Sequence, residues 1–208
     1  MKILMCLILS VILPLSLCSC DFNTNSGKNA AQPPDADNLS SVTVTLDFFR
    51  QSGYASNQFA VWIESESQLV KTLYATRYTA NGGYKQRPDS IPDWVSKSGL
   101  SEMTKAQVDA VTSATPKSGS VSYIWDLTDR NGEPVPPGEY TFVVEGSLRW
   151  KNRVVYSGVI DTGGEAVTVQ AEAEYFYEGS DGQAALTADS PENTMITNVS
   201  VSFTPVQI

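Results

Sequence analysis

Several segments of the chain alternate between apolar and polar residues with a period of two. The clearest are VTVTLDF at 42–48, FAVWI at 59–63, AVTVQAEAEYFY at 166–177 and MITNVSVSF at 195–203. Successive side chains of a β-strand point to opposite faces, so this pattern predicts strands with one face on a core and the other in water. Further segments bring the total to about eight strands, at 69–76, 121–127, 140–150 and 153–160. Turn residues separate most of them, which predicts an all-β fold, an immunoglobulin-like antiparallel β-sandwich.

The same alternation predicts which residues face the core. These are Val42, Val44, Leu46, Phe48, Phe59, Val61, Ile63, Val167, Val169, Ala171, Ala173, Tyr175, Thr197, Val199, Val201 and Phe203. The segment 166–177 is predicted as one continuous strand, with Glu172 and Glu174 on its solvated face. Trp125 follows the alternation of its own strand, so we expect it to pack in the core as well.

The segment 125–146 (WDLTDRNGEPVPPGEYTFVVEG) has the outline of a hairpin. The Asn-Gly pair at 131–132 suits a turn that needs a positive φ, and the prolines within 134–137 keep the connection out of a ladder. Asp129, Asn131 and Glu133 in this turn resemble part of a calcium loop. The remaining ligands and the closing bidentate glutamate are absent, so the spacing favours a simple turn.

A break of about 40 residues, roughly 79–119, interrupts the predicted strands. Sandwich connections are usually much shorter, and long ordered loops tend to carry function. Within the break, 91–98 (IPDWVSKS) and 101–111 (SEMTKAQVDAV) are predicted to form short helices, the second with Ser101 as its N-cap. The apolar residues that fall near one helical face are Leu100, Met103, Val108 and Val111. We therefore predict that the sandwich carries a partly helical insert.

Residues 1–19 have the features of a signal peptide and not of the fold. Lys2 gives a positive start, and the apolar run after it is too short to span a bilayer comfortably. The run ends in LCSC at 17–20, which resembles the lipobox of bacterial lipoproteins. The resemblance implies cleavage before Cys20, lipid on its sulfur and amine, and a membrane anchor on the extracytoplasmic, periplasmic side of the cell envelope. Modification of Cys18, or an ordinary signal peptide with incidental cysteines, is the alternative.

Residues 20–38 are predicted to form a flexible tether, because 21–38 is polar and rich in Asn, Ala and Pro. The remaining residues, 39–208, number about 170, the size of one domain with its own core. Cleavage and lipidation would leave this domain without a free thiol or a disulfide, so its core must stabilise itself.

Composition narrows the chemistry that the chain can perform. The chain has no histidine, which excludes His-dependent nucleophilic sites and, with no spare cysteine, ordinary zinc or haem ligation. The formal net charge of −9 argues against nucleic acid as a partner and against charge-driven binding to anionic lipid. No paired carboxylates stand out for a glycan-degrading enzyme.

The insert ends in a motif that points to a cofactor. The run DAVTSAT at 109–115 resembles the acceptor motif of covalently flavinylated bacterial proteins, in which a periplasmic flavin transferase takes FMN from FAD and joins its phosphate to the last threonine. The resemblance implies that Thr115 is the FMN acceptor, Asp109 the acidic residue and Thr112 the motif's first hydroxyl residue. Glycine is usual where this chain has Ser113, a departure that would slow or prevent modification. The alternative is a helix that runs into a hydroxyl-rich loop.

Other residues could support a bound flavin. An isoalloxazine ring could lie on aromatic surface, which is supplied by Tyr78, Tyr84, Trp94, Trp125 and Trp150. Trp94 lies in the insert and is the best functional candidate among the tryptophans. Lys105 and Lys117 are near enough in sequence to offset the charge of a phosphate.

Five segments resemble, in order, the predicted periplasmic proteins called domain of unknown function 2271. They lie at 61–64, 70–95, 108–116, 125–146 and 148–158, and the resemblance spans roughly 42–204. The segment 125–146 also resembles the immunoglobulin-like domain of the flagellar hook-capping protein. The resemblance implies an exported immunoglobulin-like domain, and members are associated with PepSY-type membrane flavin reductases and with flavin transferases.

Two functions are expected from these features. The first is a lipid-anchored extracytoplasmic carrier of FMN on Thr115 that exchanges electrons with a PepSY-type membrane flavin reductase and is not a self-sufficient enzyme. The second is a non-catalytic immunoglobulin-like binding or assembly module of the cell envelope, with the insert as its docking surface. A covalent flavin would distinguish the two.

Overall fold

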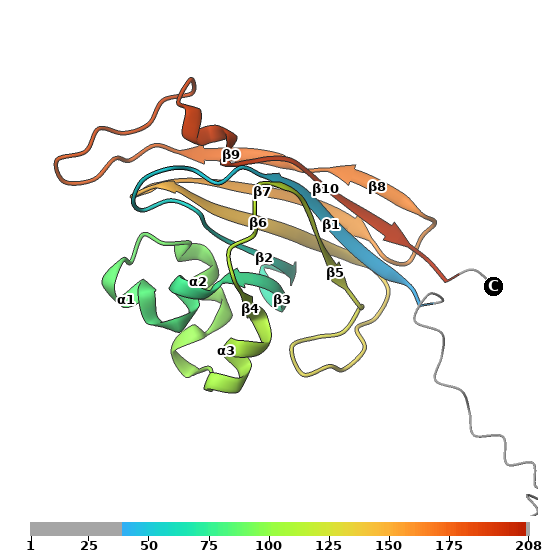
Figure 1. Cartoon of the computed structure of the whole chain (residues 1–208). Helices are drawn as coiled ribbons and strands as arrows, with labels where there is room; N and C mark the ends of the chain where they lie inside the picture. Colours follow the sequence, from blue (N-terminus) through green and yellow to red (C-terminus); the bar gives the residue numbers. More distant parts are fainter. Residues whose placement is uncertain (1–38, 207–208) are drawn as a thin grey trace, which may run out of the picture. The chain divides into compact units, whose positions relative to one another are not determined.

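The structure is a computed structural model that describes residues 39–206 (Figure 1). The expected signal peptide, the tether and the lipidation site Cys20 lie outside the described residues. Among the residues that are described, no helix is long and apolar enough to cross a membrane.

Two β-sheets share one hydrophobic core. The first sheet has four strands in the order β5 (Gly119–Trp125), β1 (Ser41–Phe48), β10 (Ile196–Thr204) and β8 (Val167–Gln170). The second has six, in the order β4 (Thr112–Ser113), β3 (Gln68–Thr76), β2 (Gln58–Ser65), β6 (Glu139–Arg149), β7 (Asn152–Asp161) and β9 (Glu172–Phe176). All neighbouring strands are antiparallel except β3 and β4, which are parallel. The predicted all-β class, an immunoglobulin-like sandwich with a partly helical insert, is confirmed.

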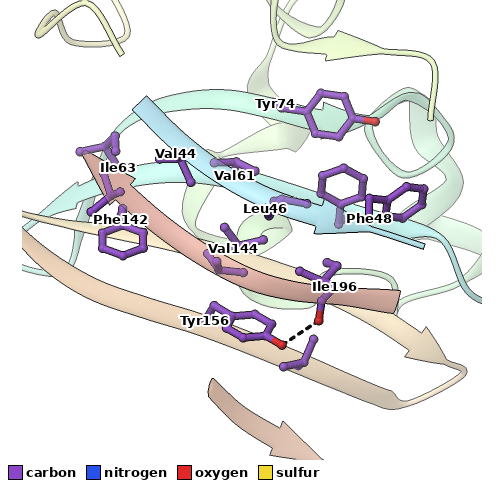
Figure 2. Close-up of a cluster of buried hydrophobic side chains, with 14 of the residues drawn as sticks. Val44, Leu46, Phe48, Val61, Ile63, Tyr74, Phe142, Val144, Tyr156 and Ile196 are labelled. Carbon is purple, nitrogen blue, oxygen red and sulfur yellow. Dashed lines mark hydrogen bonds between the residues drawn. The ribbon is translucent and has the colours of Figure 1, made fainter. Parts of the chain in front are cut away.

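The core lies where the alternation predicts it. In β1 the apolar residues Val44, Leu46 and Phe48 are fully buried, and their polar neighbours are only partly buried. Figure 2 shows these side chains facing residues of the second sheet, including Val61 and Ile63 of β2. Trp125 is also fully buried, as predicted. Burying such apolar side chains between two sheets is the main favourable term for folding.

The prediction of one continuous strand at 166–177 is wrong. The chain crosses between the sheets at Ala171, so β8 pairs with β10 and β9 pairs with β7. Val167 and Ala173 are exposed, whereas Val169 and Tyr175 still pack against the core. An unbroken alternation fixes the faces of a strand but cannot show that the chain changes partners midway.

The predicted hairpin at 125–146 is only local. Strands β5 and β6 belong to different sheets, but Thr128 and Pro134 form an antiparallel bridge within the connection between them. The sequence pattern that predicted a hairpin comes from a small turn within this connection. There Asp129 Oδ1 accepts hydrogen bonds from the backbone N–H groups of Asn131 (2.7 Å) and Glu133 (2.9 Å), and Gly132 has a φ of 85°. The expectation of a turn at this place is therefore confirmed.

The insert forms short helical segments that cover the outer face of the second sheet (Figure 1). They are η2 (Thr79–Gly83), α1 (Tyr84–Gln86), α2 (Pro92–Ser98), η3 (Leu100–Glu102) and α3 (Lys105–Val111). A further short helix, η4 (Pro191–Met195), precedes β10. Strand β2 is consequently buried on both faces, with Val61 toward the sandwich core and Trp62 toward the insert.

The N-cap prediction for the last helix of the insert is wrong. Ser101 lies in η3, and α3 begins after Thr104. The Thr104 Oγ1 accepts from the Gln107 N–H at 3.3 Å, while the Gln107 side chain accepts from the Thr104 N–H at 2.8 Å. This reciprocal capping box has its own sequence signature, a Thr followed three residues later by Gln, which identifies the true start of the helix.

Candidate functional site

The acceptor-like motif at 109–115 spans the end of a helix and the start of an extended segment. Asp109 is exposed in the last turn of α3. The chain then enters β4, where Thr112 pairs with Ala75 and Ser113 with Thr76. The parallel pairing attaches the middle of the motif to the end of β3, so that β4 forms one edge of the second sheet (Figure 1).

Thr115 lies in the extended connection after β4. Its side chain is half-buried, and its preceding neighbours Ser113 and Ala114 are exposed. The connection is held on both sides of Thr115, because the Tyr74 hydroxyl donates to the Ala114 carbonyl at 3.4 Å and the Arg50 N–H donates to Ser118 Oγ at 2.9 Å. A hydroxyl with small neighbours is thus presented on an anchored, extended segment.

Three basic residues lie close to this connection through backbone contacts or along the chain. Arg77 directly follows Thr76, the strand partner of Ser113, and Arg50 contacts Ser118 through its backbone. Arg50, Arg77 and Lys117 are all exposed, and within residues 39–206 none of them forms an ion pair. Because the chain as a whole carries a net charge of −9, exposed cations near the motif are the residues that could offset the charge of an anionic group.

Two of the predicted site residues point inward. Thr112 Oγ1 is buried and has no hydrogen-bond partner in the described part of the chain. Trp94 is fully buried in the hydrophobic cluster under the insert, where its indole N–H donates to Thr72 Oγ1 at 3.1 Å. The Trp94 ring therefore offers no surface to a ligand in this structure. It belongs to the buried cluster under the insert, of which Thr115 is not a member.

Tyr78 is the aromatic candidate that the structure leaves exposed beside the motif. Its side chain is 47% exposed, and it lies two residues beyond Thr76, the strand partner of Ser113. Trp125 is buried in the sandwich core, and Trp150 lies in the turn between β6 and β7. Lys105 begins α3, so the whole helix separates it from Thr115.

Sequence reasoning did not identify Tyr74 as a support for the motif. The Tyr74 ring packs against Tyr123 with ring centroids 4.8 Å apart, and its hydroxyl reaches Ala114. Burial raises the pKa of the Tyr74 hydroxyl well above its ordinary value, and a hydrogen bond with Ser113 lowers it only partly. Tyr74 therefore stays protonated and remains a hydrogen-bond donor.

A second polar cluster ties the insert to the sheet beneath it. The Glu145 carboxylate is fully buried and accepts from the backbone N–H groups of Trp94 (2.9 Å) and Asp93 (3.3 Å) and from Arg153 Nη1 (3.1 Å). Arg153 also pairs with Asp93 and lies over the Phe176 ring, 4.1 Å from its centroid. In the sequence, this cluster is indicated by one acidic residue, Glu145, that stands inside the apolar run FVVEG.

The pKa of Glu145 is raised to about 7. Burial is the largest cause and the nearby Asp93 carboxylate the second, while the N–H groups of α2 and the Arg153 guanidinium oppose the shift. The carboxylate is engaged on all sides by α2 and Arg153. We therefore interpret the cluster as a structural clamp between α2 and β6.

A cavity of about 550 Å³ opens between β3 and the insert. It is lined in part by α3, but Trp94, Asp109, Thr112 and Thr115 do not line it. Within residues 39–206 no three His, Cys, Asp or Glu side chains cluster in a way that could hold a metal ion.

One family model matches the chain, over residues 40–178, with the description predicted periplasmic protein (DUF2271). Neither the curated proteins nor the solved structures gave a match. The matched region runs from the start of β1 to just beyond β9 and includes the insert, its motif and the Glu145 cluster. The description supports an extracytoplasmic location. Because the match covers well over half of the chain's length, the chain belongs to the DUF2271 family of predicted periplasmic proteins.

Proposed function

We propose that this protein is a lipid-anchored extracytoplasmic electron carrier that holds FMN covalently on Thr115. The observation that carries the proposal is the presentation of Thr115. Its hydroxyl lies on an extended connection that is fixed at Ala114 and Ser118, next to small exposed neighbours. A separate transferase must reach the hydroxyl to modify it, and this segment is accessible in that way.

The modification is a transfer of a phosphoryl group. The Thr115 oxygen forms a bond to the FMN phosphorus of FAD, the bond between the two phosphates breaks, and AMP leaves. The hydroxyl proton goes to a base of the transferase or to solvent. A bound FMN supplies reversible electron storage, a chemistry that protein side chains lack.

The residues around Thr115 fit the attached group. Arg77 and Lys117 are exposed cations that can offset the remaining negative charge of the phosphodiester. Tyr78 supplies an exposed ring on which the isoalloxazine can lie, a role that the buried Trp94 does not fill. The contribution of the chain is to present the acceptor, neutralise charge and support the ring.

The anchor and the partner complete the proposal. Lipid on Cys20 would hold the domain at a membrane, and the 18 residues after it, if they form the flexible tether that their composition predicts, would have a root-mean-square reach of roughly 20–25 Å. Such a tether would keep the domain within reach of a PepSY-type membrane flavin reductase in the same membrane. The motif, the lipobox and the resemblance of the chain to its family support this partner.

The test is mass spectrometry of the full chain co-expressed with a flavin transferase. We expect an FMN adduct on the peptide that contains Thr115, its loss in Thr115→Ala, and its retention in the control Ser120→Ala, which removes an exposed hydroxyl that does not hold the segment. Suppose that Thr115 stays unmodified while a known acceptor in the same cells is modified. The carrier function is then wrong, and the binding or assembly module with the insert as docking surface replaces it.

A further inference from the structure

The cavity between β3 and the insert has the size of a small-molecule site. Its volume of about 550 Å³ falls within the range of roughly 300–1,000 Å³ that such sites occupy. Its walls come from three parts of the chain: β3, the α2–α3 region, and the connection that carries Arg130. The cavity is separate from the Thr115 connection, so a ligand can bind in it whether or not Thr115 carries a flavin.

The cavity exists because the edge of β3 is only partly covered. Strand β4 pairs with Ala75 and Thr76 alone, and in the described part of the chain no strand pairs with this edge of β3 before Ala75. Helix α3 passes beside the open edge with the small residue Ala110, and Gly99 ends α2 with a φ of 67°. A Cβ atom added to Gly99 would meet nothing within 4 Å, which shows that the wall is open here.

The walls combine apolar surface with two cations. Leu69, Met103 and Val111 provide the apolar part. Lys71 Nζ is held by Asp126 Oδ1 at 2.7 Å, and Arg130 Nη2 donates to the Leu69 carbonyl at 2.9 Å. A guanidinium has five N–H donors, so this one contact orients the Arg130 group and leaves donors for a ligand.

We infer that this cavity binds a small amphipathic monocarboxylate. Its carboxylate would pair with Arg130, and its apolar body would pack against Leu69, Met103 and Val111. Lys71, which is already paired with Asp126, would make a smaller contribution. Glu102 also lines the cavity and disfavours a second anionic group on the ligand. With a net charge of −9 the protein repels anions at long range, so binding depends mainly on Arg130, because the charge of Lys71 is already offset by Asp126.

The experiment uses the full chain and the fluorescent probe 8-anilinonaphthalene-1-sulfonate, displaced by octanoate or by the neutral 1-octanol. We expect saturable probe binding, and at equal concentration at least fivefold stronger displacement by octanoate. Arg130→Gln should weaken octanoate binding about tenfold and remove its advantage over octanol, because a charge-assisted hydrogen bond is lost. Lys105→Gln is the matched control, since Lys105 is an exposed cation of the insert that does not line the cavity.

A second variant tests the location of the site. Ala110→Trp should fill the cavity and reduce probe affinity at least tenfold, and the exposed position of Ala110 favours a folded variant. Should that variant not fold, hydrogen exchange of the unaltered chain with and without octanoate gives the same information, through protection of residues 98–111. Equal displacement by octanol and octanoate, equal effects of the Arg130 and Lys105 variants, or no protection of 98–111 would each overturn the inference.

Discussion

The hydroxyl of Tyr74 donates a hydrogen bond to the carbonyl oxygen of Ala114, the residue before the proposed FMN acceptor, across a distance of 3.4 Å. Tyr74 belongs to β3 and packs on Tyr123 of β5, so this contact joins the acceptor segment to both sheets. The presentation of Thr115 therefore depends on the sandwich and not only on the motif.

Tyr74→Phe should slow flavin loading of Thr115 about two- to fivefold, because the transferase must then order a looser segment. The bond is long, so the free energy of unfolding should fall by less than about 1 kcal/mol. The measurement is the rate of FMN incorporation at limiting transferase. Tyr156→Phe is the control: it removes the 2.7 Å bond to the Ile196 carbonyl in the core (Figure 2) and should leave the loading rate unchanged. Equal slowing in both variants would contradict a local role for Tyr74.

Removing the cations beside Thr115 should make the midpoint potential of the bound flavin more negative. One unit charge about 10 Å away in water contributes roughly 0.4 kcal/mol, or about 20 mV for one electron. The double variant Arg77→Gln and Lys117→Gln should therefore shift the potential by about 40 mV, measured by spectroelectrochemistry at low salt. Lys105→Gln, at the far end of α3, should have a smaller effect. An unchanged potential in the double variant would mean that the flavin does not lie near these residues.

Tyr78 and Trp94 should respond in opposite ways to substitution. Tyr78→Ala should change the free energy of unfolding by less than about 1 kcal/mol, because about half of the side chain is exposed, and it should increase flavin fluorescence by removing the ring on which the flavin stacks. Trp94→Phe should destabilise the domain by roughly 1–3 kcal/mol through lost packing and the lost bond to Thr72, with normal flavin loading. Thermal unfolding and flavin fluorescence of both variants test this. A loading defect in folded Trp94→Phe protein would restore Trp94 as a site residue.

The sequence predicted the parts of the fold that depend on local periodicity. The buried face of β1 follows from strict alternation, and the partly helical insert follows from an over-long break between strands. Pairing partners are not a local property, which is why the crossing at Ala171 and the separation of β5 from β6 escaped prediction.

The same limit applies to the candidate site: its local motif could be identified from the sequence, but its non-local contacts could not. The motif predicts Thr115 at the end of the insert, where the structure places a half-buried threonine with exposed small residues before it, but the motif did not indicate that Trp94 would be buried. A tryptophan in a helical segment can face solvent or a sheet, and only the packing of α2 on β6 decides between them. The supports from Tyr74, Arg50 and Thr76 come from other elements, at distances along the chain that no short motif spans.

The buried Glu145 should make the stability of the domain depend on pH. Its pKa is raised to about 7 in the folded state, above the ordinary value of 4.5, so the folded protein binds this proton more tightly than the unfolded chain. The resulting stabilisation is complete below about pH 4.5 and is lost as the pH rises through about 7, with a magnitude of about 3 kcal/mol.

Glu145→Gln keeps an acceptor for the α2 N–H groups but cannot titrate. Its free energy of unfolding should therefore fall less between pH 5 and pH 8 than that of the unaltered chain. Chemical denaturation at both pH values measures the difference, with the exposed Glu172→Gln as control. The same pH dependence in all three proteins would show that Glu145 remains charged in the fold, held by Arg153 and the N-terminus of α2.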